Sequence, residues 1–184
     1  MKKQAGRVVF LLFLAMATST GGFASGGDEA ADPWAPARFL VGSWSTEGLS
    51  RPEEGNGDAS FSLELDNTIM VRKNRVEFPP VKPGDKPAVH EDLMLIYRGP
   101  GGFRAMYFDN EKHVIEYAVT FAEKESAAVF ETLNSEGPRF RLLYRLLPDK
   151  TLAAEFFIAQ PGKGFALYLK GRSRRQGSVR PDMK

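Results

Sequence analysis

The chain has 184 residues, a length that predicts one domain with a sizeable core. A composition of 42% hydrophobic and 26% charged residues excludes a wholly disordered or low-complexity chain. The absence of cysteine excludes disulfides, thiolate metal sites and cysteine nucleophiles. Because there are only two histidines, a three-histidine metal site within one chain is also excluded.

The first 24 residues have the layout of a secretory signal peptide. Lys2, Lys3 and Arg7 precede an apolar run over 8–17, and small residues follow up to Ala24. The apolar run is too short to span a bilayer as a helix. We therefore expect cleavage after Ala24 and an exported protein, periplasmic or secreted, with no membrane insertion after cleavage.

Removal of this segment changes the charge balance. The precursor has 25 Lys and Arg against 23 Asp and Glu, and the segment holds three of the cations and no anion. The mature chain therefore has 25 − 3 = 22 cations against 23 anions, a net charge of −1. A chain so close to neutral has no broad electrostatic reason to bind nucleic acid, and we expect no such partner.

The composition shifts again after the signal. Residues 25–35 predict a flexible leader, and the stretch 34–40 predicts one or two helical turns, with Pro36 tolerated in the first turn. The barrel domain argued below is expected over 36–175, followed by a flexible tail over 176–184.

Beyond residue 40 the chain becomes a series of short runs rich in Val, Ile, Phe, Tyr and Thr, divided by Gly, Pro, Asn and Asp. Most of the connections between these runs are short, which suits antiparallel hairpins and leaves no room for the crossovers of a parallel sheet. The ten expected strands are 41–49, 58–66, 68–78, 90–98, 102–109, 112–122, 126–133, 139–147, 151–159 and 164–174.

Alternation within these runs predicts one buried and one solvated face. In the second run, Ala59, Phe61, Leu63 and Leu65 alternate with polar residues. A meander this regular closes most economically into an all-β, antiparallel up-and-down barrel of about ten strands, with a two-sheet sandwich as the alternative. Charged residues on both faces disfavour an outer-membrane barrel.

Two ends of the chain carry a recognisable pattern. Gly42-Ser43-Trp44 opens the first strand, and the last strand ends in a cluster of arginines. This combination resembles the calycin superfamily of lipocalin-like barrels. The resemblance implies that Trp44 plugs the closed end of the barrel, with Arg174 or Arg172 stacked over its ring.

Three further runs, at 71–77, 90–94 and 107–117, are similar to a bacterial lipocalin-like domain family of unknown function, itself distantly similar to nitrobindin. The similarity covers about residues 36–175 and implies a barrel with a small ligand, not a reaction. Nitrobindin holds haem through a histidine late in its chain, and this sequence has no histidine after His113. We therefore expect no haem and no other cofactor or metal.

Four polar residues on adjacent strands form the candidate site. Arg72 and Asn74 share one face of the third strand, and His90 and Asp92 share one face of the fourth. If both faces point inward, Arg72 would hold an anionic head group and the others would be hydrogen-bond partners. The alternative is a structural Arg72–Asp92 ion pair, either outside the barrel or buried.

The aromatic content favours a ligand cavity. Tyr107 and Tyr117, on the next two strands, complete the candidate ligand-binding set. A ten-strand barrel encloses space for a ligand, and an apolar cavity with a few polar anchors is the usual form of such a site. The sequence predicts a barrel that binds a small apolar or amphipathic molecule. An enzyme using the four polar residues for acid–base chemistry and a filled structural or interaction barrel remain open alternatives.

Overall fold

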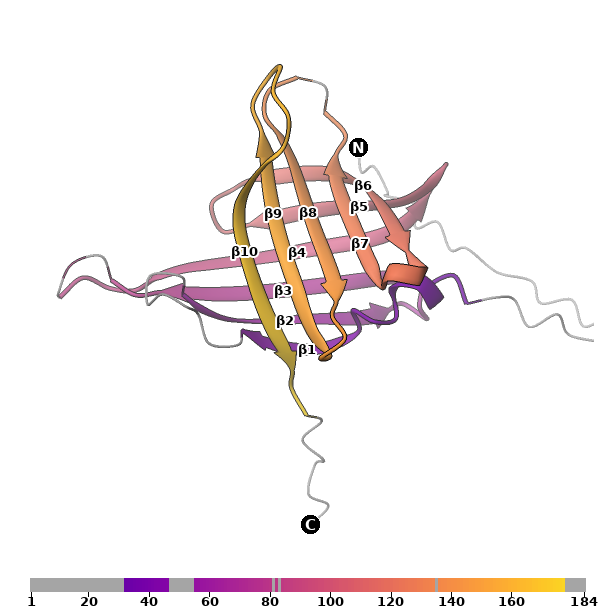
Figure 1. Ribbon diagram of the computed structural model, residues 1–184, viewed down its shortest axis with the longest axis horizontal. Helices are drawn as coiled ribbons and strands as arrows, with labels where there is room; N and C mark the ends of the chain where they lie inside the picture. Colours follow the sequence, from indigo (N-terminus) through magenta and orange to yellow (C-terminus); the bar gives the residue numbers. More distant parts are fainter. Residues whose placement is uncertain (1–31, 47–54, 81, 83, 135, 178–184) are drawn as a thin grey trace, which may run out of the picture. The chain divides into compact units, whose positions relative to one another are not determined.

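The structure, a computed structural model, describes residues 32–46, 55–80, 82, 84–134 and 136–177. The expected signal peptide, most of the leader and all of the tail after residue 177 lie outside these residues. The described part of the chain contains ten strands and two short 3-10 turns, η1 (Ala35–Ala37) and η3 (Glu123–Glu125) (Figure 1). It has no helix of the length and apolarity that crossing a membrane requires.

The strands form one closed antiparallel barrel. Each pairs with its neighbour in the sequence, and the last pairs with the first. This arrangement confirms the predicted all-β barrel and excludes the two-sheet sandwich. The strands are β1 (Gly42–Thr46), β2 (Asn56–Glu64), β3 (Ile69–Phe78), β4 (Ala88–Gly99), β5 (Gly102–Asp109), β6 (Val114–Ala122), β7 (Ala127–Thr132), β8 (Arg139–Leu146), β9 (Thr151–Ala159) and β10 (Ala166–Arg175).

A plug of η1 and its flanking residues closes one end of the barrel. The indole of Trp34 is buried and its Nε1 donates to the Asn67 carbonyl at 2.6 Å. The indole of Trp44 is also buried, and its Nε1 donates to the Leu40 carbonyl at 2.8 Å. Both polar edges are thus satisfied in the core. Trp34 lies inside the expected leader, so the folded part of the chain begins earlier than the predicted boundary at residue 36.

The arginine over Trp44 is Arg175, and the prediction of Arg174 or Arg172 is wrong. The Arg175 guanidinium carbon lies 4.3 Å from the indole centre. Trp44 is directly opposite Arg175 in the β1–β10 register, so their side chains share the inner face, whereas alternation turns Arg174 outward. The Arg175 guanidinium also donates to the Val41 and Phe39 carbonyls, the latter at 3.0 Å.

This stack explains the glycine that precedes Trp44 by two residues. Gly42 has φ of +129°, a conformation that side chains rarely adopt, and a Cβ there would overlap the Arg175 guanidinium. The glycine of the Gly-x-Trp pattern is therefore needed because β1 and the Arg175 side chain of β10 approach each other closely at this position.

The core extends from the plug to the middle of the barrel, where Arg72 is paired with Phe61 on one side and Met94 on the other. Its members are large apolar side chains from most of the strands, in contact with the two indoles. The fully or almost fully buried ones include Leu40, Phe61, Met70, Met94, Ile96, Ala105, Ala128, Phe130 and Leu152. The polar cluster described next runs from the row of Arg72 toward the open end, where β2, β4, β6, β8 and β10 begin.

Candidate functional site

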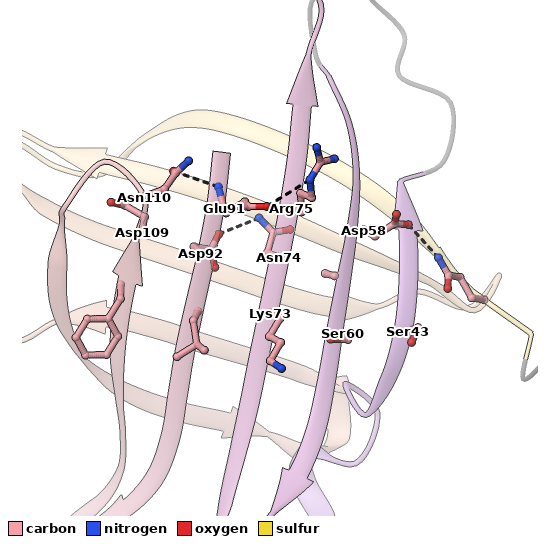
Figure 2. Close-up of a pocket in the computed structure, with 14 residues that line it drawn as sticks. Ser43, Asp58, Ser60, Lys73, Asn74, Arg75, Glu91, Asp92, Asp109 and Asn110 are labelled. Atoms are coloured by element: carbon pink, nitrogen blue, oxygen red, sulfur yellow. Dashed lines mark hydrogen bonds and ion pairs between the residues drawn. The ribbon is translucent and has the colours of Figure 1, made fainter. Parts of the chain in front are cut away.

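Arg72, Asn74 and Asp92 meet inside the barrel. Arg72 and Asp92 are buried, and Arg72 Nη1 donates to Asp92 Oδ1 in an ion pair. Asn74 Nδ2 donates to the other carboxylate oxygen at 2.8 Å (Figure 2). In the β3–β4 register Asn74 is directly opposite Asp92, and Arg72 is the diagonal neighbour on the same face. The ion pair is therefore inside the barrel, and the external alternative is excluded.

His90 lies at the solvent edge of this cluster, with 25% of its side chain exposed. Its Nε2 is 3.5 Å from Asp92 Oδ2 and 3.2 Å from the Tyr107 hydroxyl. Its Nδ1 is 3.1 Å from Glu111 Oε1. The structure thus brings His90 and Tyr107 to the cluster as well, and His90 is linked to Arg72 through Asp92.

Two residues that the sequence analysis did not assign extend the network. The Tyr107 hydroxyl donates to Asp109 Oδ2 at 3.2 Å, and His113 Nδ1 lies 2.8 Å from the same oxygen. The His113 amide donates to Asp109 Oδ1 at 2.9 Å. The spacing of an aspartate followed four residues later by a histidine across a tight turn was the available signal, since aspartates at turns bind nearby amides.

Charges in this extension stabilise one another. Burial on its own would raise the pKa of Asp109, but the amide and the imidazole of His113 outweigh it and lower that pKa. The hydrogen bond to Asp109 raises the pKa of His113. The pair therefore favours a carboxylate and an imidazolium.

Tyr117 lies below the polar cluster in a row of aromatic rings that pack edge-on. It is buried and meets the Tyr107 ring edge-on at 6.5 Å and the Phe130 ring at 6.4 Å. Phe130 in turn meets Tyr144 edge-on at 6.1 Å, and the Arg72 guanidinium carbon lies 5.7 Å from the Tyr144 ring centre. The cluster therefore has an aromatic floor, and Tyr117 contributes its ring to that floor.

Burial fixes the protonation states of the inner groups. It raises the pKa of Tyr107 and of Tyr117 well above the ordinary value, so both phenols stay protonated near neutral pH. Burial on its own would lower the Arg72 pKa, but the neighbouring Tyr144 and Asp92 raise it above the usual value. The interior thus offers a guanidinium and phenolic hydroxyls as hydrogen-bonding groups, and no phenolate base.

One donor of the cluster is left over. Arg72 Nε is buried and has no hydrogen-bond partner among the described residues. An unpaired buried donor costs about 1–3 kcal/mol relative to a paired one. This nitrogen is therefore an unsatisfied donor inside the barrel.

An aromatic wall from β8–β10 lines the open end of the barrel. The Phe140 and Phe156 rings stack with centres 5.8 Å apart, and Tyr168 meets Phe156 edge-on at 6.2 Å. A bulge between Leu167 and Leu169 places Leu169 opposite Phe156. Tyr168 is 72% exposed and Leu169 is 52% exposed, so this end presents apolar surface to solvent.

Exposed apolar residues gather at this end. Of the large hydrophobic side chains that are exposed among the described residues, Leu65 alone lies at the plugged end. The others lie at or beside the strand ends of the open half: Val89, Phe108, Val114, Leu133, Leu167, Tyr168 and Leu169. Apolar surface concentrated in this way commonly marks a binding region.

Within the described residues no group of three or more histidines and carboxylates is arranged to hold a metal ion. No family model matches the chain, and no curated protein sequence matches it.

Proposed function

We propose that the barrel binds a small amphipathic molecule through its open end. The apolar body would lie against the Phe140–Phe156–Tyr168 wall, and an oxygen of the head group would accept a hydrogen bond from Arg72 Nε. The observation that carries this proposal is that unpaired, buried nitrogen. A ligand oxygen there would recover the free energy that the orphaned donor costs.

The surrounding chemistry supports a neutral or anionic oxygen in preference to a cation. Arg72 stays charged, and the protonated phenol of Tyr117 is a hydrogen-bond donor, whereas the Tyr107 hydroxyl already donates to Asp109. Asp92 already accepts hydrogen bonds from Arg72 and Asn74. The stack of Arg175 on Trp44 supports kinship with the calycin barrels, and the signal-like segment 1–24 supports export.

The test uses dodecanoate, dodecanol and dodecane as probes, followed by native mass spectrometry and isothermal titration calorimetry. We expect the acid and the alcohol to bind, because both offer an oxygen, and the alkane to bind more weakly. Arg72→Lys keeps a positive charge next to Asp92 but removes Nε, and should weaken the binding of both oxygen-bearing probes by about tenfold. Arg75→Lys, on the outer face of the same strand, is the matched control.

The proposal fails if none of the probes binds, which would indicate a filled barrel. It also fails if Arg72→Lys and Arg75→Lys bind the probes equally well, because the probe oxygen would then not accept a hydrogen bond from Arg72 Nε. Far-UV circular dichroism on each variant establishes that the barrel is folded before binding is compared.

A further inference from the structure

A shallow hollow, open to solvent, lies on the outer face of the sheet over β1–β5, and Gln176 after β10 also lines it. Its volume is about 640 Å³, within the range of small-molecule sites. Consecutive residues of a strand point to opposite faces, so the outward Lys73 of this hollow and the inward Arg72 belong to different sites. Figure 2 shows Lys73, Ser60 and Ser43 side by side on neighbouring strands.

Cross-strand register builds one wall of the hollow as a straight row. Ser43 is opposite Ser60, Ser60 is opposite Lys73, Lys73 is opposite Leu93, and Leu93 is opposite Phe108. The row therefore runs from two hydroxyls through an ammonium to two apolar side chains. The serines are small, which leaves space beside Lys73 for a ligand.

The adjacent row is already paired. Asp58 accepts from Gln176 Nε2 at 2.9 Å. Arg75 pairs with Glu91 at 3.4 Å (Figure 2). It also pairs with Glu77 at 3.1 Å. Glu77 and Glu91 thus share the Arg75 guanidinium, and Asp58 is bonded to the neutral side chains of Ser45 and Gln176.

The row that contains Lys73 is not paired in this way. No described residue forms an ion pair or a hydrogen bond with the side chains of Lys73, Ser60 or Ser43. Lys73 is exposed, and Phe108 is 39% exposed although it is a large aromatic residue. The hollow thus offers an unpartnered cation, two unused hydroxyls and an apolar shelf next to them.

We infer that this hollow binds a small carboxylate with an aryl or alkyl body. The carboxylate would pair with the Lys73 ammonium and accept from the Ser60 hydroxyl, and the apolar body would lie over Leu93 and Phe108. A charge-assisted hydrogen bond fixes the head group, and burial of the shelf supplies the remaining affinity. Asn74, Asp92 and Asp109 of the interior cluster also line this hollow, but the proposed contacts are made by outward side chains and do not involve Arg72.

The test titrates the full chain with 4-phenylbutyrate, 4-phenylbutanol and 4-phenylbutylamine, observed by amide chemical shifts in NMR. We expect saturable shifts at Ser60, Lys73 and Leu93 with the carboxylate, and much smaller ones with the alcohol and the amine. Lys73→Gln should weaken carboxylate binding by about tenfold, whereas Lys73→Arg should retain it. Lys170→Gln, an exposed lysine on β10, is the matched control and should change nothing.

Several results would overturn the inference. If the alcohol bound as tightly as the carboxylate, the hollow would not recognise a negative charge. If the amine bound more tightly, the acidic residues of the hollow would be the ones that bind the ligand. If Lys73→Gln bound the carboxylate with unchanged affinity, Lys73 would not be the residue that holds it. Shifts confined to the interior and abolished by Arg72→Lys would place the probe inside the barrel, which would support the interior site and refute this one.

Discussion

The two ends of this barrel differ in whether their buried polar groups have hydrogen-bond partners. At the plugged end the indole nitrogens of Trp34 and Trp44 each donate to a backbone carbonyl, and apolar side chains fill the space around them. Toward the open end, the buried Arg72 in the middle of the barrel has an unpaired nitrogen, and aromatic residues at the open end itself face solvent. The plugged end is built as a stabilising core, and the open end keeps unsatisfied chemistry of the kind that binding sites retain.

The largest difference between the ends should appear when one aromatic residue is truncated at each. Trp44→Ala removes a buried indole, its hydrogen bond and its stack on Arg175, and should lower the free energy of unfolding by about 5 kcal/mol. Tyr168→Ala at the open end should change it by less than about 0.5 kcal/mol, because the side chain is exposed. Urea unfolding of both variants measures the contrast. Similar losses would contradict the division between the ends.

The buried ion pair gives the next largest effect. Asp92→Ala leaves Arg72 as an uncompensated buried charge and should cost about 3 kcal/mol of stability. Replacing both members, as Arg72→Met with Asp92→Leu, should recover most of that loss because no charge then remains unpaired. Thermal and urea unfolding test this order. A double variant that is less stable than Asp92→Ala would show that the pair is itself a strong stabilising contact.

Loss of the contact between Arg175 and Trp44 at the plugged end should lower the free energy of unfolding by a smaller amount. Arg175→Met removes the stack on Trp44 and the donors to the Phe39 and Val41 carbonyls, and should cost about 1 kcal/mol. Arg172→Met provides the control, since Arg172 is exposed and pairs only at 3.7 Å with Asp149. Urea midpoints compare the two, and equal midpoints would remove Arg175 from the stability of the plug.

The smallest effect is a pH dependence at the open end. His113, with its raised pKa, contributes stability that is complete below its unfolded pKa of about 6.5 and is lost as pH rises through the folded pKa. Asp109, with its lowered pKa, contributes above its unfolded value of about 3.9 and loses that contribution as pH falls through the folded pKa. His113→Asn should therefore reduce stability more at pH 5.5 than at pH 8.5, as unfolding curves at both values would reveal. An NMR titration of His113 should give a midpoint above 6.5.

The sequence predicted the barrel because its signals are local and repeat along the chain. Period-two alternation with short connections decides strands, faces and order without tertiary information. The wrong prediction of the arginine that stacks on Trp44 has a different origin. Choosing Arg175 over Arg174 requires the β1–β10 register, which aligns residues from the two ends of the chain and has no local signal.

The interior cluster was predictable in part for the same reason. Alternation placed Arg72 with Asn74 on one face of its strand and His90 with Asp92 on one face of the next, and the β3–β4 register then brought the two pairs together. The involvement of Asp109 and His113 depends on a turn conformation, with Lys112 at a φ of +73°, that periodicity does not describe. That these residues bind a ligand stays a prediction.

The β1–β10 seam has a consequence for how the barrel folds and fails. Every other strand pair is a hairpin, whereas the seam joins residues as far apart as Ser45 and Gln176, 131 positions along the chain. Contacts of that separation form late, because the loop they close is long, and the seam has only three paired positions. Unzipping it would expose two strand edges at once while the hairpins stay intact, and free edges are templates for aggregation. Arg175, which stacks on Trp44 across this seam, is therefore placed to oppose the exposure of these two edges.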